Sequence, residues 1–491
     1  MAEVEEPTSA PTGMGRRTSR GAVWVAAATW LQRGVAVVVL LALAGVLDPR
    51  ALGTASLASL LSFLLLAVSE LGFLNALIYQ RTRVREAAET TLFVTGACTL
   101  VLAAGLFLLA DPLARFFGTP EAGDVLRVYA LVLPFSALAQ VAEAELTRLL
   151  AFSRRFAASV PSVLGAVVTV VLAVRGAGVW SIVVGDAVRE VLRCLVAFAV
   201  LPQRFGPRWH REVAREMWRY ARGSFTATWL DNALQNVDYL LVGKLLGPGA
   251  LGLYTLAFRV AILPFVVVTQ VVVGVMFPAL VQVSDDRRRM EDGFQVSFRL
   301  GAAAVVLLGG GVSALAPYLA LLGEDWRAAT TAAQLLGVYV CFRSAAFMAT
   351  PVVQALGRPG AVAVLRGAWV VLLVLLLLTV GRRGITEVAA VQVLVAAVLF
   401  LAHAKLAADL GGASLPRLLL DLARPLLAAL VAAGALLAVR RLGGTWDDDT
   451  SVVAFLVAGV LFTLVYLGAL LALGPRLLRD VRRVVGTLRS R

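Results

Sequence analysis

Residues 451–473 read SVVAFLVAGVLFTLVYLGALLAL and contain no charged side chain. At a rise of about 1.5 Å per residue, a helix of this length spans a hydrocarbon core that is about 30 Å thick. Similar apolar runs follow one another along most of the 491 residues, and 60% of the chain is hydrophobic. The mean hydropathy of +0.85 is far above that of water-soluble domains. The sequence therefore predicts an all-α integral membrane protein.

Hydropathy windows of about nineteen residues predict about fourteen transmembrane helices in this chain. They form two successive groups of six and a final pair. The first six lie near 21–46, 51–79, 90–110, 125–150, 156–174 and 178–201. The next six lie near 223–246, 249–282, 295–322, 331–356, 360–380 and 384–410, and the pair lies near 424–442 and 451–473.

The order of these segments predicts how the chain is divided. Two six-helix bundles are joined by a polar stretch rich in arginine and tryptophan, which is typical of an interfacial linker. The amino end carries no small-residue cleavage signature, so we expect a cytoplasmic tail there and not a signal peptide. The predicted parts are a tail (1–20), a bundle (21–201), a linker (202–222), a second bundle (223–410), a terminal helix pair (411–473) and a basic cytoplasmic tail (474–491).

An internal repeat relates the two bundles. The motif LDPRALG at 47–53 matches LGPGALG at 246–252 in its Leu, Pro, Ala, Leu and Gly positions, and Gly178 pairs with Gly384 at nearly the same offset. Six helices, an even number, separate the two copies, so the copies must have the same orientation in the membrane. We therefore expect an axis along the membrane normal, with any central site between the two halves.

Charge in alternate connections predicts the orientation. The net charge of +14 comes from small basic groups between apolar runs and not from one patch, which disfavours nucleic acid as a partner. The termini and the loops after even-numbered helices hold 27 basic residues, whereas the opposite loops hold 10. Because basic residues are enriched on the cytoplasmic side, both termini are predicted to be cytoplasmic.

The sequence contains no spacing of residues that is typical of a metal site or of a nucleotide-binding loop. Cys98, Cys194 and Cys341 lie far apart in apolar stretches, and neither His210 nor His403 has a second ligand at a useful spacing. No glycine-rich loop ends in Lys-Ser or Lys-Thr. We expect no cofactor apart from a coupling cation, H⁺ or Na⁺, and no catalytic residues.

Ionisable groups at membrane depth identify candidate functional residues, because each costs about 2.5 to 3.5 kcal/mol on insertion scales. In the seventh segment, Asp231, Gln235 and Asp238 share one helix face, which Asn232 and Asn236 widen to an arc of about 160°. Such a face cannot meet lipid, so it lines either a wet cavity or the seam between the halves. The candidate cavity residues are Arg33, Glu70, Asp231, Asn232, Gln235, Asp238, Arg259, Arg343 and Arg366.

Two further sets of charges have simpler explanations. Asp186, Arg189, Glu190 and Arg193 stand at i, i+3, i+4 and i+7 of the sixth segment, a spacing that favours mutual ion pairs in an interhelical clasp. The run Asp447–Asp449 lacks spaced oxygen partners and is predicted to be a solvated loop.

Several motifs resemble one known group of transporters. The stretches LAGVLDPRALG (43–53), SELGF (69–73), GVWS (178–181), DYLLVGKLLGP (238–248), ALGLYTLAFR (250–259) and FPAL (277–280) are similar to the polysaccharide-exporter, or O-antigen flippase, branch of the multidrug and oligosaccharidyl-lipid exporter superfamily. The resemblance implies a bacterial inner-membrane flippase with a cavity that opens alternately to either side. It implies a polyprenyl-diphosphate-linked oligosaccharide as substrate and other polysaccharide-assembly proteins as partners.

The resemblance also implies roles for individual residues. Cavity arginines that hold the diphosphate and sugar correspond here to Arg33 and Arg259, in the first and eighth segments. The family often has a basic residue where Gly45 stands, whereas the second repeat keeps Lys244 at the equivalent place. We therefore expect that the first half lacks the charge contact that this basic residue would make.

Three other functions remain open at this point. A multidrug antiporter of the same superfamily could use Asp231 or Asp238 as a proton or sodium site, although the terminal helix pair disfavours it. A peptidoglycan-precursor flippase is a second alternative. A membrane-embedded glycan enzyme is disfavoured because no connection exceeds about twenty residues, too few for a separate catalytic domain.

Overall fold

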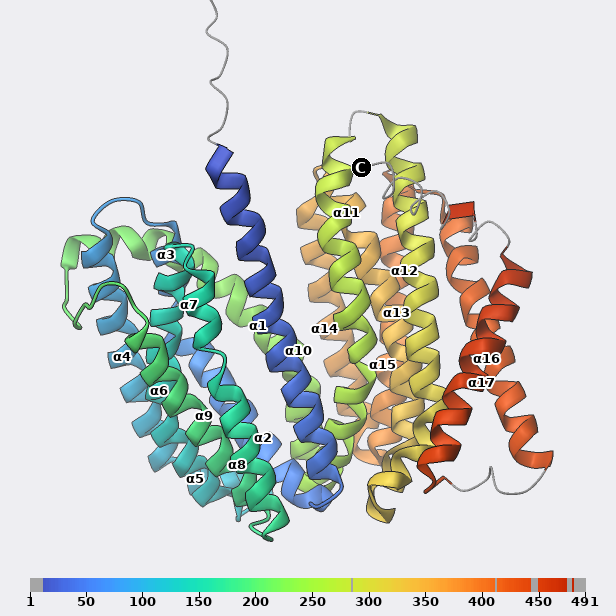
Figure 1. The fold of residues 1–491 in the computed structure, drawn as a ribbon, viewed down its shortest axis with the longest axis horizontal. Coiled ribbons are helices and arrows are strands. Elements are labelled where there is room, and N and C mark those ends of the chain that lie inside the picture. Colours follow the sequence, from blue (N-terminus) through green and yellow to red (C-terminus); the bar gives the residue numbers. More distant parts are fainter. Residues whose placement is uncertain (1–11, 284–285, 411–412, 443–448, 475–478, 481–491) are drawn as a thin grey trace, which may run out of the picture. The chain divides into compact units, whose positions relative to one another are not determined.

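The computed structural model describes residues 12–283, 286–410, 413–442, 449–474 and 479–480 (Figure 1). The regular structure in these ranges is helical throughout, and no strand occurs in them. Within these described ranges, twelve helical runs are long and apolar enough to cross a membrane. The all-α membrane fold that the composition predicts is therefore confirmed. Residues 1–11, 443–448 and 481–491, which belong to the predicted tails and one predicted loop, lie outside the described residues.

The difference between twelve runs and fourteen predicted helices has two local causes. Helix α9 (Val179–Ala199) lies over the predicted segment 178–201, but its four charged residues exclude it on composition. Helix α10 (Arg211–Ala261) covers the predicted segment 223–246 and the start of the predicted segment 249–282. From Gln235 onward it forms one apolar run with the helix that follows, and this run ends at Gln282. Gly247 has non-helical angles (φ 82°, ψ −179°), and Pro248 follows it, so α10 consists of two limbs. The exact number of membrane crossings stays a prediction.

The described chain forms two compact units. The first contains residues up to Leu47 together with Thr54–Asn236, and the second contains Asp48–Gly53 together with the chain from Val237 onward. The division falls inside α10, whereas the sequence predicts it in the linker 202–222. The assignment of the two six-helix bundles stays a prediction.

The first unit is built around α6, which packs against α4 and α9, while α8 packs along α9. At the α8–α9 contact, a Cβ added to Gly165 would lie 2.8 Å from the carbonyl oxygen of Gly185, so glycine permits close approach of the backbones. Its helices are α1 (Thr12–Ala44), α2 (Pro49–Ser69), α3 (Phe73–Tyr79), α4 (Val84–Leu108), α5 (Ala110–Phe116), α6 (Ala122–Arg148), α7 (Phe152–Ala157), α8 (Pro161–Val174) and α9.

The amino-terminal end of α10 covers the turn between α2 and α3. Val213, Met217 and Ala221 are buried against this turn and the start of α4, while Trp209 and Trp218 are exposed. Gly72 adopts φ 76°, and a Cβ there would lie 2.2 Å from the carbonyl oxygen of Ala221. The polar linker thus ends in an amphipathic helix whose apolar side packs on the first unit.

The second unit is centred on α13 (Thr330–Ala355), which packs against α12 and α15 over much of its length. Most of α13 is buried, including its polar residues Arg343 and Ser344. The carboxyl-terminal helices α16 (Leu415–Leu442) and α17 (Val452–Leu473) lie side by side and pack on α12 (Figure 1). The other elements are the π-helix η1 (Phe265–Thr269), α11 (Gln270–Gln282), α12 (Arg287–Leu315), the 3₁₀ helices η2 (Ala316–Leu322) and η3 (Glu324–Ala329), α14 (Pro359–Val380), the 3₁₀ helix η4 (Gly381–Arg383) and α15 (Ile385–Asp409).

The two copies of the repeated motif touch each other within the second unit. A Cβ on Gly53 would lie 1.8 Å from the carbonyl oxygen of Pro248, and a Cβ on Gly252 would lie 1.8 Å from that of Pro49. The contact is reciprocal, as a local two-fold relation between the motifs requires. Asp48 caps the start of α2, because its Oδ1 atom accepts a hydrogen bond from the Ala51 backbone N–H at 2.8 Å. This cap and Pro49 in the first turn together fix the direction in which the helix begins.

Candidate functional site

A buried polar centre lies between the two limbs of α10 and α15. Asp238, on the first limb, is only 3% exposed. The Tyr254 hydroxyl on the second limb donates to Asp238 Oδ2 at 2.7 Å, and Gln392 Nε2 on α15 donates to the same oxygen at 2.9 Å. The break at Gly247 makes this possible, because a continuous helix would hold residues 238 and 254 about 24 Å apart along its axis.

The polar centre has one unused acceptor. Gln392 Nε2 also lies 3.3 Å from the Tyr254 hydroxyl, whereas Gln392 Oε1 is buried and lacks a hydrogen-bond partner among the described residues. A carboxylate, a carboxamide oxygen and a hydroxyl are hard oxygen donors of the kind that bind alkali and alkaline-earth cations. No group of three or more His, Cys, Asp and Glu side chains is poised for a metal in the described part of the chain. The arrangement therefore suits a proton or a weakly held cation.

Aromatic rings connect this centre to α13. The Tyr239 ring lies 5.5 Å from both the Tyr254 and Phe258 rings, and Phe258 lies 6.0 Å from Tyr339. Edge and tilted contacts of this kind stabilise a packed core and hold ring positions closely. The Tyr339 hydroxyl in turn accepts a hydrogen bond from Arg343 Nη1.

Arg343 occupies an aromatic cage. Its guanidinium carbon lies 5.0 Å from the centroid of Phe265, 5.7 Å from Tyr339, 5.9 Å from Phe347 and 5.8 Å from Trp369. The residue is 9% exposed, and its Nε has no hydrogen-bond partner among the described residues. Cation–π contacts can supply about 2 kcal/mol or more when the cation is desolvated, which helps to offset the cost of burying this charge.

Arg366 shares one wall of this cage. It lies on α14, and its guanidinium carbon is 5.1 Å from the Phe347 centroid on the ring that also contacts Arg343. Arg366 is half-buried. Two guanidinium groups thus meet one aromatic ring within the second unit.

The other candidate residues are placed differently. Arg259 is exposed on the second limb of α10 and lies within electrostatic range of Tyr239, which connects it to the same cluster. Arg33 on α1 and Glu70 after α2 are half-buried in the first unit, and Arg193 lies within electrostatic range of Glu70. Asn232 is half-buried and Gln235 is exposed, and both belong to the first unit, while the side chain of Asp231 lies outside what the structure describes.

The structure thus brings Asp238, Arg259, Arg343 and Arg366 into one cluster of the second unit. Sequence reasoning missed Tyr254, Tyr339 and Gln392, which supply the hydrogen bonds. Gln392 stands alone in the apolar run of α15, a signal that could have identified it. The aromatic cage depends on α13, α14 and η1 meeting in space, and no local pattern indicates it.

The predicted charge clasp of α9 is confirmed and extends to a second helix. Arg189 pairs with Asp186 at 2.7 Å, and Arg193 pairs with Glu190 at 3.0 Å. Arg193 also reaches Glu143 on α6 at 2.6 Å. This clasp joins α9 to α6 within the first unit and leaves its carboxylates paired.

Comparison with known proteins identifies relatives by sequence. Residues 42–331 match the family described as "Polysaccharide biosynthesis protein". The chain is 29% identical to the succinoglycan biosynthesis transport protein ExoT of Rhizobium meliloti (strain 1021) over 324 residues, which are 64% of this chain and 65% of ExoT. It is 26% identical to the lipopolysaccharide biosynthesis protein WzxC of Escherichia coli (strain K12), over 67% of this chain and 68% of WzxC. The matched region thus spans about two thirds of each relative.

Comparison with solved structures identifies the fold. The lipid II flippase MurJ in its inward closed conformation matches with a TM-score of 0.73 at 13% identity, covering 92% of this chain and 99% of that chain. An inward-facing multidrug resistance MATE family transporter matches with a TM-score of 0.60 at 16% identity, over 79% of this chain and 98% of that one. Likeness at such low identity is a likeness of fold alone. The family match in sequence covers more than half of the residues, and the chain therefore belongs to the polysaccharide biosynthesis protein family.

Proposed function

We propose that this protein is a flippase that moves a polyprenyl-diphosphate-linked oligosaccharide, the repeat unit of a surface polysaccharide, across the bacterial inner membrane. The main observation in support of this proposal is the family match over 42–331, together with the similarity to ExoT, which is named a succinoglycan biosynthesis transport protein. The all-helical fold with twelve apolar runs supports it, since such a chain can enclose a path through the bilayer. Transport by alternating access requires no covalent chemistry on the substrate.

Arginines supply the proposed contacts to the anionic diphosphate. Arg259 is the strongest candidate in the second unit because it is exposed and lies within electrostatic range of Tyr239 in the buried cluster. Arg366, whose guanidinium contacts the Phe347 ring, is half-buried in the same cluster, and Arg33 is the candidate in the first unit. Guanidinium groups suit this role because their planar N–H fork matches two phosphate oxygens at once. Arg343 is enclosed by rings and acts by positioning the cluster.

The polar centre at Asp238 is the proposed site of energy coupling. Loading of Asp238 and Gln392 Oε1 with H⁺ or Na⁺ would neutralise a carboxylate that joins both limbs of α10 to α15. A cation that binds one conformation more tightly than the other shifts the equilibrium toward that conformation. Such a site can therefore influence to which side of the membrane the substrate path opens.

The charge count supports a cytoplasmic position for both termini in the inner membrane. Proteins that build and polymerise the repeat unit are the expected partners, with the lipid-linked oligosaccharide and the surrounding lipids as ligands.

The test is complementation of a host from which the polysaccharide flippase gene is deleted. Wild-type chain should restore surface polysaccharide, whereas Arg259→Ala and Arg33→Ala should each reduce export by at least tenfold at equal protein level. Arg382→Ala, an exposed arginine outside the cluster, is the matched control and should restore export fully. Full export by both Arg33→Ala and Arg259→Ala would refute the assignment of the cavity residues.

The same strains separate the alternative functions. Drug resistance without any effect on glycans would replace the proposal with a multidrug antiporter. Rescue of a conditional mutant in peptidoglycan-precursor export would identify a peptidoglycan lipid-precursor flippase. Glycan transfer by the purified protein would show that it is an enzyme and not a flippase.

A further inference from the structure

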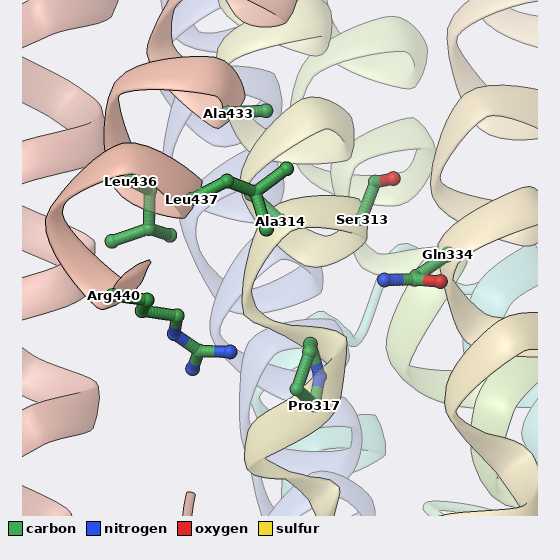
Figure 2. Close-up of a pocket in the computed structure, with 8 residues that line it drawn as sticks. All are labelled: Ser313, Ala314, Pro317, Gln334, Ala433, Leu436, Leu437 and Arg440. Atoms are coloured by element: carbon green, nitrogen blue, oxygen red, sulfur yellow. The ribbon is translucent and has the colours of Figure 1, made fainter. Parts of the chain in front are cut away.

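A pocket of about 130 Å³ lies in the second unit among α12, η2, α13 and α16 (Figure 2). Its volume exceeds the roughly 30 Å³ that one water molecule occupies in the liquid. Its lining combines the polar residues Ser313, Gln334 and Arg440 with apolar residues that include Pro317 and Leu437. The pocket is separate from the cluster around Asp238 and shares no residue with it.

Arg440 presents unused donors to this pocket. Its guanidinium carbon lies 4.6 Å from the centroid of Tyr318, so the planar group stacks on a ring. Its Nε and Nη2 atoms are buried and have no hydrogen-bond partner among the described residues. Arg327 provides a contrast, because it pairs with Glu324 at 2.8 Å and with Asp449 at 3.0 Å. Buried N–H donors without a partner are costly, and an anion in the pocket that accepts from them would remove that cost.

The polar groups converge on one position. In Figure 2, Arg440 on α16 and Gln334 on α13 point toward the pocket from opposite sides, with Pro317 between them. A phosphodiester fits these donors, because two of its oxygens can accept from the guanidinium fork while the Gln334 amide donates to another.

The apolar lining residues indicate that the anion belongs to a lipid. Leu437 lines the pocket and is also 56% exposed on α16, one of the helices apolar enough to cross the membrane. Arg440 stands in the last turn of that helix, where its apolar run ends, so lipid headgroups are expected at this level. The neighbouring Arg441 is exposed and adds positive potential at the same level. Acyl chains that cover Leu437 would therefore bring a phosphate within reach of Arg440.

We propose that this pocket binds an anionic phospholipid, with its phosphate on Arg440 and Gln334 and its first acyl carbons against Ala433 and Leu437. The lipid bridges α16 to α12 and α13 and thereby holds the carboxyl-terminal helix pair on the second unit. The site is a structural lipid site and does not depend on the proposed transport function.

Native mass spectrometry of the purified full chain with phosphatidylglycerol tests the site. Wild-type protein should retain phosphatidylglycerol and gain thermal stability from it, as expected when a ligand binds only the folded state. Arg440→Gln should retain at least fivefold less, while the matched control Arg441→Gln should behave as wild type. Ala433→Phe fills the pocket without removing the arginine and should show the same loss.

Three outcomes would overturn the proposal. Wild-type retention by Arg440→Gln or by Ala433→Phe would place the lipid elsewhere. Equal stabilisation by inorganic phosphate would identify a soluble anion as the ligand. Equal retention of phosphatidylcholine would remove the requirement for an anionic headgroup. None of these measurements depends on transport, so a failed flippase assignment would leave the result intact.

Discussion

Asp238 shows how one side chain can join three helical segments. Its Oδ2 atom accepts from both Tyr254 and Gln392, so the carboxylate connects the two limbs of α10 with α15. A buried carboxylate is expensive at membrane depth, and the two donors are what make it tolerable. The free energy of unfolding of the second unit therefore depends on the hydrogen bonds that this carboxylate accepts.

Removal of one of these donors should destabilise the fold. Tyr254→Phe keeps the ring contacts to Tyr239 and Phe258 but leaves Asp238 with Gln392 as its remaining side-chain donor. We expect a loss of about 1 to 3 kcal/mol in the free energy of unfolding, seen as a lower Tm of the protein purified in detergent. Tyr220→Phe, at an exposed tyrosine, should change stability by less than about 0.5 kcal/mol. An unchanged Tm for Tyr254→Phe would show that the hydroxyl does not support the carboxylate.

Arg343 illustrates a different way to bury charge. Four aromatic rings and one hydroxyl surround it, and no carboxylate of the described chain lies within 4 Å of it. Lysine could not replace it without loss, since an ammonium group lacks the planar surface that stacks on rings. The cage thus requires arginine for its shape as well as for its charge.

At the scale of elements, the repeated motifs make a close backbone contact within the second unit. Gly53 and Gly252 each face a backbone carbonyl of the other motif, with no room for a methyl group. The first turn of α2 therefore cannot separate from the second limb of α10 without losing this packing. Glycine is required here for close approach of two backbones.

A single methyl group should break this contact. Gly252→Ala would place a Cβ 1.8 Å from the carbonyl oxygen of Pro49, so the backbones must shift. We expect a clear fall in Tm and in the amount of folded protein. Gly249→Ala, three residues earlier in the same motif, has no atom within 4 Å of its added Cβ and should be tolerated. Equal behaviour of the two variants, measured by size-exclusion chromatography and thermal melting, would show that the close approach is not required.

The helices of the first unit are joined by charge. Arg193 lies between Glu190 on its own helix and Glu143 on α6, and both distances are within 3.0 Å. In a low-dielectric interior, removal of one partner leaves an uncompensated charge, which costs about 3 to 5 kcal/mol in buried pairs. The clasp thus ties α6 to α9 at a defined position along each helix.

At the scale of the whole molecule, the distribution of arginine predicts the topology. Fluorescent protein fused to the carboxyl terminus should fluoresce, and alkaline phosphatase at the same place should be inactive, because both report a cytoplasmic position for that end. A phosphatase fused after residue 444, in a loop predicted on the opposite side, should be active. The reverse pattern of activities would invert the orientation and with it the assignment of both termini.

The membrane class, the helical stretches and the clasp on α9 could be predicted from sequence because each depends on neighbours within a few turns. Residues 178–201 show where composition alone is insufficient. This segment is helical, yet its four charges exclude it from a count based on apolarity. The charges pair with one another along α9 and also with Glu143 and Tyr129 on α6, and a scan of apolarity along the sequence contains no information about α6.

The sequence by itself determined that this chain is a helical membrane protein, where its apolar runs lie, and which motifs relate it to polysaccharide biosynthesis proteins. Apolar length and local periodicity specify these properties because they depend on contact with lipid and on bonds within each helix. Only the tertiary structure decided that Asp238 meets Gln392, that four rings enclose Arg343, and that the donors of Arg440 face a pocket. These pairings join residues on different helices, and their partners are chosen by packing in three dimensions, which no local pattern encodes.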